Sequence, residues 1–193
     1  MEDTNLQPKQ STTGRNIFFA AGMLFLVGLV AIMAINMRKV ESTDLQDRKA
    51  PEFSLTLFDH FEQEQLVLSE LRGQVVVINF WASWCVECYK EAALLEQAWR
   101  DYKDQDVLFI GVDYLDTPKE AMAYMAQYDI TYPNGPDLGD KIADDYAITG
   151  VPETFFIDKE GNIAHVQIGP IEEDQLYSLL EKLVAQPYAG IPE

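Results

Sequence analysis

The chain has 193 residues, of which 48% are hydrophobic and 24% charged, and this suits one globular domain with a sizeable core plus some additional chain. The net charge of −18 is unevenly spread, because residues 51–193 hold eight Lys or Arg against 27 Asp or Glu, a balance of −19. A domain of that charge would be repelled by phosphate backbones, so we expect no nucleic acid among its partners.

An apolar run of 19 residues, 17–35, lies near the N-terminus, with Arg15 before it and Arg38 after it. A helix of this length spans a hydrocarbon core of about 30 Å. A cleaved signal peptide is the alternative, but its apolar region is usually about 7–15 residues long and ends in a small-residue cleavage site. We therefore expect a tail over 1–15, a single transmembrane anchor over 16–37 that contacts the lipid bilayer through 17–35, and a linker over 38–50.

The orientation of this anchor is a separate question. Four basic residues follow the run within residues 38–49, whereas Lys9 and Arg15 precede it. Read literally, the positive-inside rule places the following domain in the cytoplasm.

The rest of the chain alternates between short apolar runs and amphipathic segments. In chain order we expect a strand at 53–58, a short apolar segment at 66–68, a helical turn ending at Gly73, a strand at 75–81, a helix at 85–102, a strand at 107–112, a helix at 118–128, a short helix at 138–146, strands at 153–158 and 163–168, and a helix at 171–185. Pro133, Gly135 and Pro136 break the chain before the short helix. This order predicts an α/β domain over 51–186, with a central mixed sheet flanked by helices, and a C-terminal tail over 187–193.

The segment 75–81, Val-Val-Val-Ile-Asn-Phe-Trp, is a continuous apolar and β-branched run. Such a run is typical of a strand that is buried on both faces in the middle of a sheet. In the helix that follows, Leu94, Leu95, Ala98 and Trp99 recur at core spacing.

The two cysteines of the chain, Cys85 and Cys88, stand where this buried strand turns into a helix. With two cysteines the chain can build neither a multi-disulfide scaffold nor a closed zinc site of cysteine alone. A cysteine at a helix N-terminus meets free N–H groups and the positive end of the helix dipole, which favour the thiolate. Cys85 would attack a substrate disulfide and Cys88 would resolve the mixed disulfide. A buried core pair and half of a metal site are the alternatives.

Two motifs resemble the thioredoxin superfamily: Phe-Trp-Ala-Ser-Trp-Cys-x-x-Cys at 80–88 and Gly-Val-Pro-Glu-Thr-Phe-Phe-Ile-Asp at 150–158. The chain is similar, more narrowly, to the membrane-tethered thioredoxin-like proteins of the ResA, CcmG/DsbE and TlpA type. The resemblance covers about residues 50–185 and implies a thioredoxin-like fold, in which 111–136 matches the extra helical insertion of that branch.

The resemblance also implies roles for residues around the cysteines. Pro152 would be a cis proline facing the disulfide, where its missing N–H leaves neighbouring backbone free to pair with an extended substrate. A trans turn proline is the alternative. Trp84, Val151 and Glu153 would contact the substrate.

Glu91, three residues after Cys88, matches an acidic residue that this branch keeps beside its active site. It would share a helix face with Cys88 and could take and return the proton of that thiol. A solvated helix glutamate is the alternative. Asn79 stands where thioredoxin has a buried Asp, which makes Glu91 the better candidate for this proton transfer.

The chain departs from the family pattern at three places. Val86 and Glu87 replace the usual proline-containing pair between the cysteines, Tyr89 replaces a basic residue, and Ala93 stands where a helix-kinking proline is common. Our hypothesis is that Glu87 disfavours the thiolate and makes the pair more reducing.

The resemblance implies a membrane-tethered thiol–disulfide oxidoreductase with its catalytic domain outside the cytoplasm. It would reduce disulfides in client proteins, apocytochrome c among them, with electrons from a membrane donor and with no dissociable cofactor. A copper-binding chaperone of similar fold stays open, since two thiolates suit Cu(I) and His165 could approach them. A general disulfide oxidase and a peroxidase are further alternatives, although 83–85 lacks the motif of a peroxidatic cysteine.

Overall fold

The computed structural model describes residues 21–29, 45–59, 61, 63–188 and 190. The chain divides into two compact units, 1–39 and 40–193. In the first unit, residues 21–29 are helical and almost all of their side chains are exposed. No helix within the described ranges is both long and apolar enough to cross a membrane. Most of the expected anchor at 16–37 lies outside the described residues, as do the tail at 1–15 and the first part of the linker, so these boundaries stay predictions.

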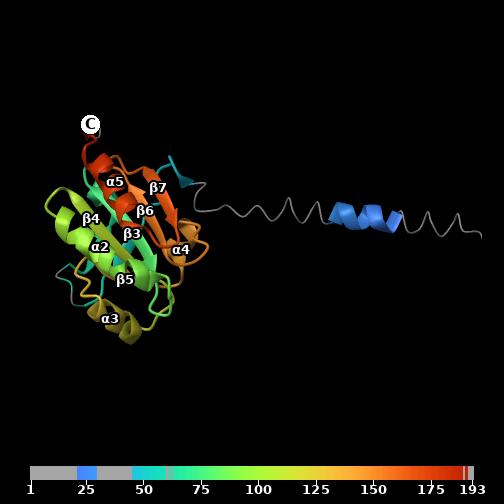
Figure 1. The fold of residues 1–193 in the computed structure, drawn as a ribbon, viewed down its shortest axis with the longest axis horizontal. Coiled ribbons are helices and arrows are strands. Elements are labelled where there is room, and N and C mark those ends of the chain that lie inside the picture. The colour runs from blue at the N-terminus through green and yellow to red at the C-terminus, as the bar shows by residue number, and fades with distance from the viewer. Residues whose placement is uncertain (1–20, 30–44, 60, 62, 189, 191–193) are drawn as a thin grey trace, which may run out of the picture. The chain divides into compact units, whose positions relative to one another are not determined.

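A five-stranded sheet forms the centre of the second unit (Figure 1). Its strands are β3 (Val75–Trp81), β4 (Val107–Asp113), β5 (Asn134–Pro136), β6 (Glu153–Ile157) and β7 (Ile163–Ile168). The spatial order is β5-β4-β3-β6-β7. Strands β3, β4 and β5 are parallel, whereas β6 is antiparallel to β3 and β7 is antiparallel to β6. The mixed sheet expected from the sequence is confirmed.

Helices and a small hairpin cover both faces of this sheet. They are the hairpin strands β1 (Ser54–Thr56) and β2 (Gln65–Val67), the 3-10 turn η2 (Leu68–Leu71), and the helices α2 (Cys88–Tyr102), α3 (Pro118–Gln127), α4 (Lys141–Asp145) and α5 (Glu173–Val184). Apolar residues of α2, α3 and α5 join one core cluster, while those of the hairpin and α4 join a second. In Figure 1, α3 is set apart at one end of the domain.

Strand β3 lies between the two core clusters, and every one of its seven residues is buried. Its side chains alternate between the faces of the sheet. Val75, Val77 and Trp81 join the cluster under α2 and α5, whereas Val76 and Ile78 join the one under α4. The unbroken apolar run in the sequence is therefore the signature of a central strand that is covered on both sides.

Two elements differ from the sequence prediction. Strand β5 lies where Pro133, Gly135 and Pro136 predicted only a break. It forms because the hairpin packs against it: Phe58 N–H donates to the carbonyl of Asn134 at 3.0 Å. Gly135 is needed at that contact, since a Cβ atom there would lie 2.2 Å from the carbonyl oxygen of Thr56.

The second difference concerns the start of the active-site helix. The prediction began it at Cys85, whereas α2 begins at Cys88. The intervening turn, closed by a hydrogen bond from Cys88 N–H to the Cys85 carbonyl at 3.2 Å, links β3 to α2. Cys85 therefore lies just before the helix and faces its free N–H groups.

Candidate active site

Cys85 and Cys88 form a disulfide at the carboxyl end of β3, with their Cα atoms 5.3 Å apart. The backbone N–H of Cys88 lies 3.0 Å from the Cys85 sulfur. A backbone donor at the start of a helix stabilises negative charge on such a sulfur after reduction. The arrangement therefore suits a Cys85 that acts as a thiolate.

Both cysteines are buried, whereas three large side chains next to them in the sequence are exposed. Cys85 is 5% exposed and Cys88 is 1% exposed, whereas Trp84, Val86 and Tyr89 are 57%, 68% and 40% exposed. The disulfide thus lies just beneath a rim of large apolar side chains. Large apolar side chains exposed beside a reactive group suit the docking of another protein.

The segment before β6 lies directly against the disulfide. The Val151–Pro152 peptide bond is cis, and the Val151 carbonyl oxygen lies 3.4 Å from the Cys85 sulfur. A disulfide sulfur carries no hydrogen, but a reduced Cys85 thiol at this distance could donate to that carbonyl. Val151 and Trp84 therefore approach Cys85 from two different elements.

Glu91, in the first turn of α2, is buried at 1% exposure. One carboxylate oxygen accepts from the Asn79 amide at 2.8 Å, and the other accepts from Ile171 N–H at 2.9 Å. Burial raises the pKa of this carboxyl to about 7, against the lowering effect of those two hydrogen bonds. The alternative of a solvated helix glutamate is wrong, because α2 turns this position toward β3.

Asn79 ties Glu91 to the segment around the cis proline. Its amide donates to Glu91 and also, at 2.9 Å, to the hydroxyl of Thr154. Thr154 was not singled out from the sequence, and its place in the 150–158 motif was the available signal.

Glu153 was expected to contact the substrate, and its position argues against a direct contact. Its side chain is 1% exposed and accepts from the backbone N–H and the hydroxyl of Thr149, at 2.7 and 2.8 Å. Its backbone is paired with Phe80 on β3 and Ile168 on β7. Through Oε1, Glu153 therefore holds the loop 149–153. Its Oε2 atom is buried with no hydrogen-bond partner among the described residues, so neither carboxylate oxygen is presented on the surface.

A stack of aromatic rings supports the turn that carries the cysteines. The rings of Trp81 and Tyr124 are stacked with centroids 4.4 Å apart, and the Tyr124 hydroxyl donates to the Cys88 carbonyl at 3.2 Å. The Trp81 indole N–H donates to the Asn134 side chain at 2.7 Å. Gly111 makes room for that amide, since a Cβ atom there would lie 1.6 Å from the Asn134 oxygen.

An acidic loop holds the same turn from the side of β4, and the sequence prediction missed it. Asp116 accepts from the backbone N–H of Ser83 at 2.5 Å and from its hydroxyl at 2.8 Å. Asp113, the last residue of β4, is buried beside Asp116 at 2% exposure. The available signal was two carboxylates, one at the end of a buried strand that neighbours the cysteine-bearing one and the other three residues later.

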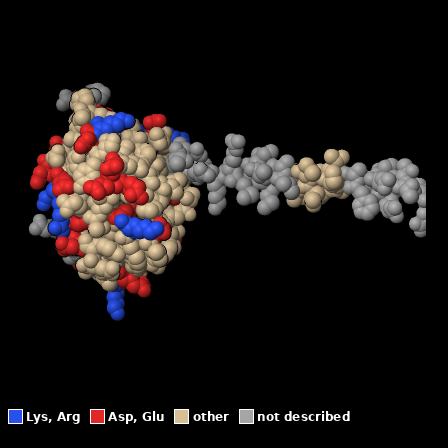
Figure 2. Space-filling model, viewed as in Figure 1, with Lys and Arg blue, Asp and Glu red and all other residues tan. Residues whose placement is uncertain are grey.

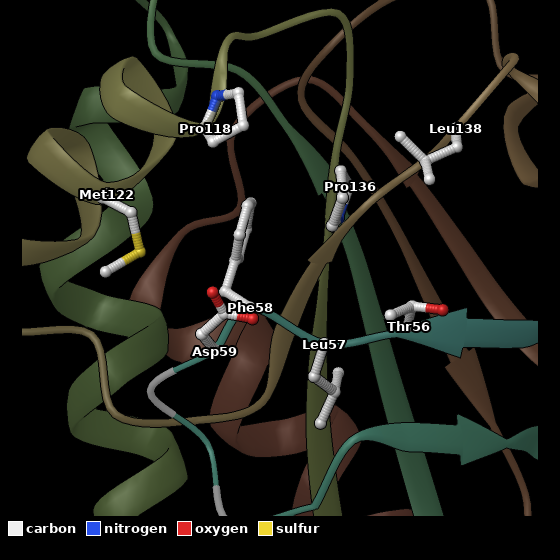
Figure 3. A pocket seen from close by; sticks show the side chains of 8 residues that line it. All are labelled: Thr56, Leu57, Phe58, Asp59, Pro118, Met122, Pro136 and Leu138. Atoms are coloured by element: carbon white, nitrogen blue, oxygen red, sulfur yellow. The ribbon is translucent and has the colours of Figure 1, made fainter.

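An apolar pocket of about 480 Å³ lies between the hairpin, the start of α3 and the end of β5 (Figure 3). Its wall is formed by Thr56, Leu57, Phe58, Asp59, Pro118, Met122, Pro136 and Leu138. Neither cysteine lines it, so this pocket is separate from the disulfide.

The copper-binding alternative requires Cys85, Cys88 and His165 to come together as ligands. Within the part of the chain that the structure describes, no three His, Cys, Asp or Glu side chains are grouped to hold a metal ion. His165 lies on β7, against the Phe156 ring and 3.3 Å from the Gln175 amide. This arrangement gives the copper alternative no support.

Residues 47–166 match the AhpC/TSA family, and the chain belongs to this family, as a thiol–disulfide oxidoreductase with a thioredoxin-like fold. It is 35% identical over 190 residues to the thiol:disulfide interchange protein DsbE of Allochromatium vinosum, with 97% of this chain and 99% of that protein covered. It is 30% identical over 170 residues to the thiol-disulfide oxidoreductase ResA of Bacillus cereus, with 88% and 96% covered.

A solved structure agrees with this relationship. The putative thiol:disulfide interchange protein DsbE from Chlorobium tepidum aligns with a TM-score of 0.66 at 25% identity, over 72% of this chain and 98% of that one. The chain is thus a thiol–disulfide oxidoreductase related to DsbE and ResA, and the resemblance inferred from the two motifs is confirmed.

Proposed function

We propose that this protein is a membrane-tethered reductase of disulfides in extracytoplasmic client proteins, with apocytochrome c as the client that the resemblance implies. The observation that carries the proposal is the Cys85–Cys88 disulfide at the start of α2, beneath an apolar rim and beside a cis proline. The apolar run at 17–35 supports the tether.

The exchange proceeds from the reduced dithiol. The Cys85 thiolate attacks one sulfur of the client disulfide, forms a mixed disulfide and releases the other client sulfur as a thiolate. Cys88 then loses its proton and attacks the Cys85 sulfur, which releases the second client thiol. Two electrons pass to the client, and the protein is left with the Cys85–Cys88 disulfide. A membrane electron donor returns the pair to the dithiol.

Client binding uses the surface around Cys85. An extended client segment would run past Val151 and Pro152, where the prolyl nitrogen has no hydrogen to donate. Trp84 and Val86 would cover its apolar side chains. Contacts of this kind hold the client sulfur in line with Cys85 for the attack.

Glu91 is the proposed proton acceptor for Cys88. Both residues lie in the first turn of α2, three positions apart, and therefore on neighbouring parts of one helix face. A carboxyl whose pKa is raised to about 7 by burial can both take and return a proton near neutral pH.

Labelling in intact cells tests location and direction together. A membrane-impermeant maleimide is applied to cells that produce the full chain, with and without prior reduction. We expect labelling of Cys85 and Cys88 without reductant, and none in a variant that lacks both cysteines. Labelling only after reductant would overturn the reducing direction, and labelling only after lysis would overturn the extracytoplasmic location.

Reduction of a defined client tests the chemistry. Reduced protein is mixed with oxidised apocytochrome c, and free client thiols are counted over time. We expect two client thiols for each protein disulfide formed. Formation of the protein disulfide without any gain of client thiols would contradict the proposal.

A further inference from the structure

Asp113 is a buried acid for which the exchange chemistry has no direct use. It is 2% exposed at the carboxyl end of β4, and its Oδ1 atom has no hydrogen-bond partner among the described residues. Burial, and then the hydrogen bond and charge of Asp116, raise the pKa of its carboxyl to about 8. Asp113 is therefore neutral at pH 7 and becomes charged in mildly alkaline solution.

Asp116 links this buried acid to the active-site turn. Both of its carboxylate oxygens accept from Ser83, one from the backbone N–H and one from the hydroxyl. The carbonyl of the same Ser83 accepts from the Tyr89 hydroxyl. Ser83 lies two residues before Cys85, so these contacts hold the backbone that leads into the reactive cysteine.

Other polar groups near the pair are already engaged. On the side of β5, the Asp137 carboxylate accepts from the first N–H groups of α4, at 3.1 and 2.7 Å. On α3, the Tyr124 hydroxyl donates to the Cys88 carbonyl. Charge on Asp113 would therefore be felt most directly by Asp116, since two carboxylates in contact cannot both ionise cheaply.

We propose that Asp113 and Asp116 share one proton, and that this pair positions the turn from Trp81 to Cys85 through Ser83. The inference rests on the proposed thiol–disulfide exchange and adds two positioning residues to it. While the pair holds its proton, Asp116 is free to accept from Ser83. When the proton is lost, repulsion between the two carboxylates loosens that contact, and Cys85 is held less well for attack.

The test follows the rate of exchange against pH. The purified full-length protein is reduced and mixed with glutathione disulfide from pH 6 to 10. Each variant is reported as a ratio to the wild type, because the ratio cancels the thiolate titration that they share. Asp113→Asn keeps a donor toward Asp116 but cannot ionise, whereas Asp104→Asn removes a carboxylate from an exposed turn and serves as the control.

We expect the Asp113→Asn ratio to be near one at pH 6.5 and to rise about tenfold by pH 9.5, the equivalent of about 1.4 kcal/mol. The Asp104→Asn ratio should stay flat. A flat Asp113→Asn ratio, or the same rise in both variants, would overturn the inference while leaving the proposed function intact. Failure of the wild type to react with the disulfide at any pH would instead sink the proposed function.

Ser83→Ala provides a second route to the same test. It removes one of the two contacts to Asp116, so the ratio of its rate to that of the wild type should rise between pH 6.5 and 9.5. In this background the added Asp113→Asn change should have less effect, because coupled residues are not additive. A flat Ser83→Ala ratio would contradict a route through Ser83, and this ratio can be measured even if Asp113→Asn does not fold.

Discussion

At the scale of single residues, two buried acids near one disulfide have raised pKa values. Glu91 lies in the first turn of α2, with its pKa raised to about 7, and Asp113 lies beside the active-site turn, with its pKa raised to about 8. In both carboxyls the largest cause is burial, which disfavours the charged form. These two carboxyls therefore carry less negative charge near neutral pH than exposed Asp and Glu side chains do.

Glu91→Gln tests the proton acceptor. We expect release of the client from the mixed disulfide to slow by roughly a hundredfold at neutral pH, a usual loss for general base catalysis. The carboxylate form of Glu91 predominates above about pH 7, so the wild-type rate should rise through that pH and the variant should lack this step. Single-turnover decay of the mixed disulfide measures both. Equal profiles in the variant and the wild type would count against the role, and Glu181→Gln on the exposed side of α5 is the control.

Our hypothesis is that the charge of Glu87 makes the cysteine pair more reducing. In the structure Glu87 pairs with Lys90 at 2.7 Å, with both side chains at least half exposed, and such pairs interact weakly. Glu87→Gln should therefore stabilise the thiolate and raise the reduction potential, by about 10 mV or roughly half a kcal/mol. Lys90→Gln should lower it. A glutathione redox titration measures both, and a fall in potential for Glu87→Gln would reverse the hypothesis.

At the scale of elements, the long apolar segments could be predicted and the short polar ones could not. Strand β3 was evident because a run buried on both faces leaves a continuous apolar pattern. Strand β5 was not, since its three residues include Gly135 and Pro136 and it forms only through contacts with β4 and the hairpin. The start of α2 was set three residues early because the turn 82–87 has no sequence signal of its own.

The face of α2 that meets the sheet gives a stability prediction. Leu95 is buried in the core at 1% exposure, whereas its neighbour Leu94 is only partly buried. Leu95→Ala should lower the free energy of unfolding by roughly 2–5 kcal/mol, through lost burial and the cavity left behind. Leu94→Ala should cost clearly less. Urea denaturation measures both, and equal losses would mean that the described face of α2 is wrong.

At the scale of the whole molecule, acidic charge predominates over the domain that carries the cysteines. Acidic side chains are spread over the face of the domain that Figure 2 shows, in keeping with the balance of −19 over residues 51–193. Charge of one sign raises the local concentration of oppositely charged partners and is screened over about 8 Å at physiological salt. A client with basic residues near its cysteines would therefore be captured faster than an acidic one.

This charge gives a prediction about salt. The rate of exchange with a disulfide peptide that carries several lysines should fall several-fold between about 20 and 500 mM salt. A peptide of the same length with glutamates in place of lysines should become faster over the same range. Stopped-flow measurement of both reactions checks this. Identical salt dependence of the two peptides would show that the charge of the domain does not attract basic clients.

The site itself could be predicted only as far as its motifs extend. Cys85 and Cys88 follow from their place between a buried strand and a helix. The contacts that hold them do not, because Ser83, Asp116 and Asn134 come from separate segments that the fold brings together. The inward side chain of Glu153 is a further example, since its burial depends on the inner position of β6 in the sheet.

The most direct test of the central claim is to trap the mixed disulfide. Cys88→Ser leaves Cys85 able to attack but nothing to resolve the product, whereas Cys85→Ser removes the proposed nucleophile. After reaction with an oxidised client, we expect a covalent complex of Cys88→Ser that dithiothreitol releases, with the client joined to Cys85 by mass spectrometry, and little complex with Cys85→Ser. Trapping through Cys88 in Cys85→Ser, with none in Cys88→Ser, would contradict the assignment of nucleophile and resolving thiol on which this account rests.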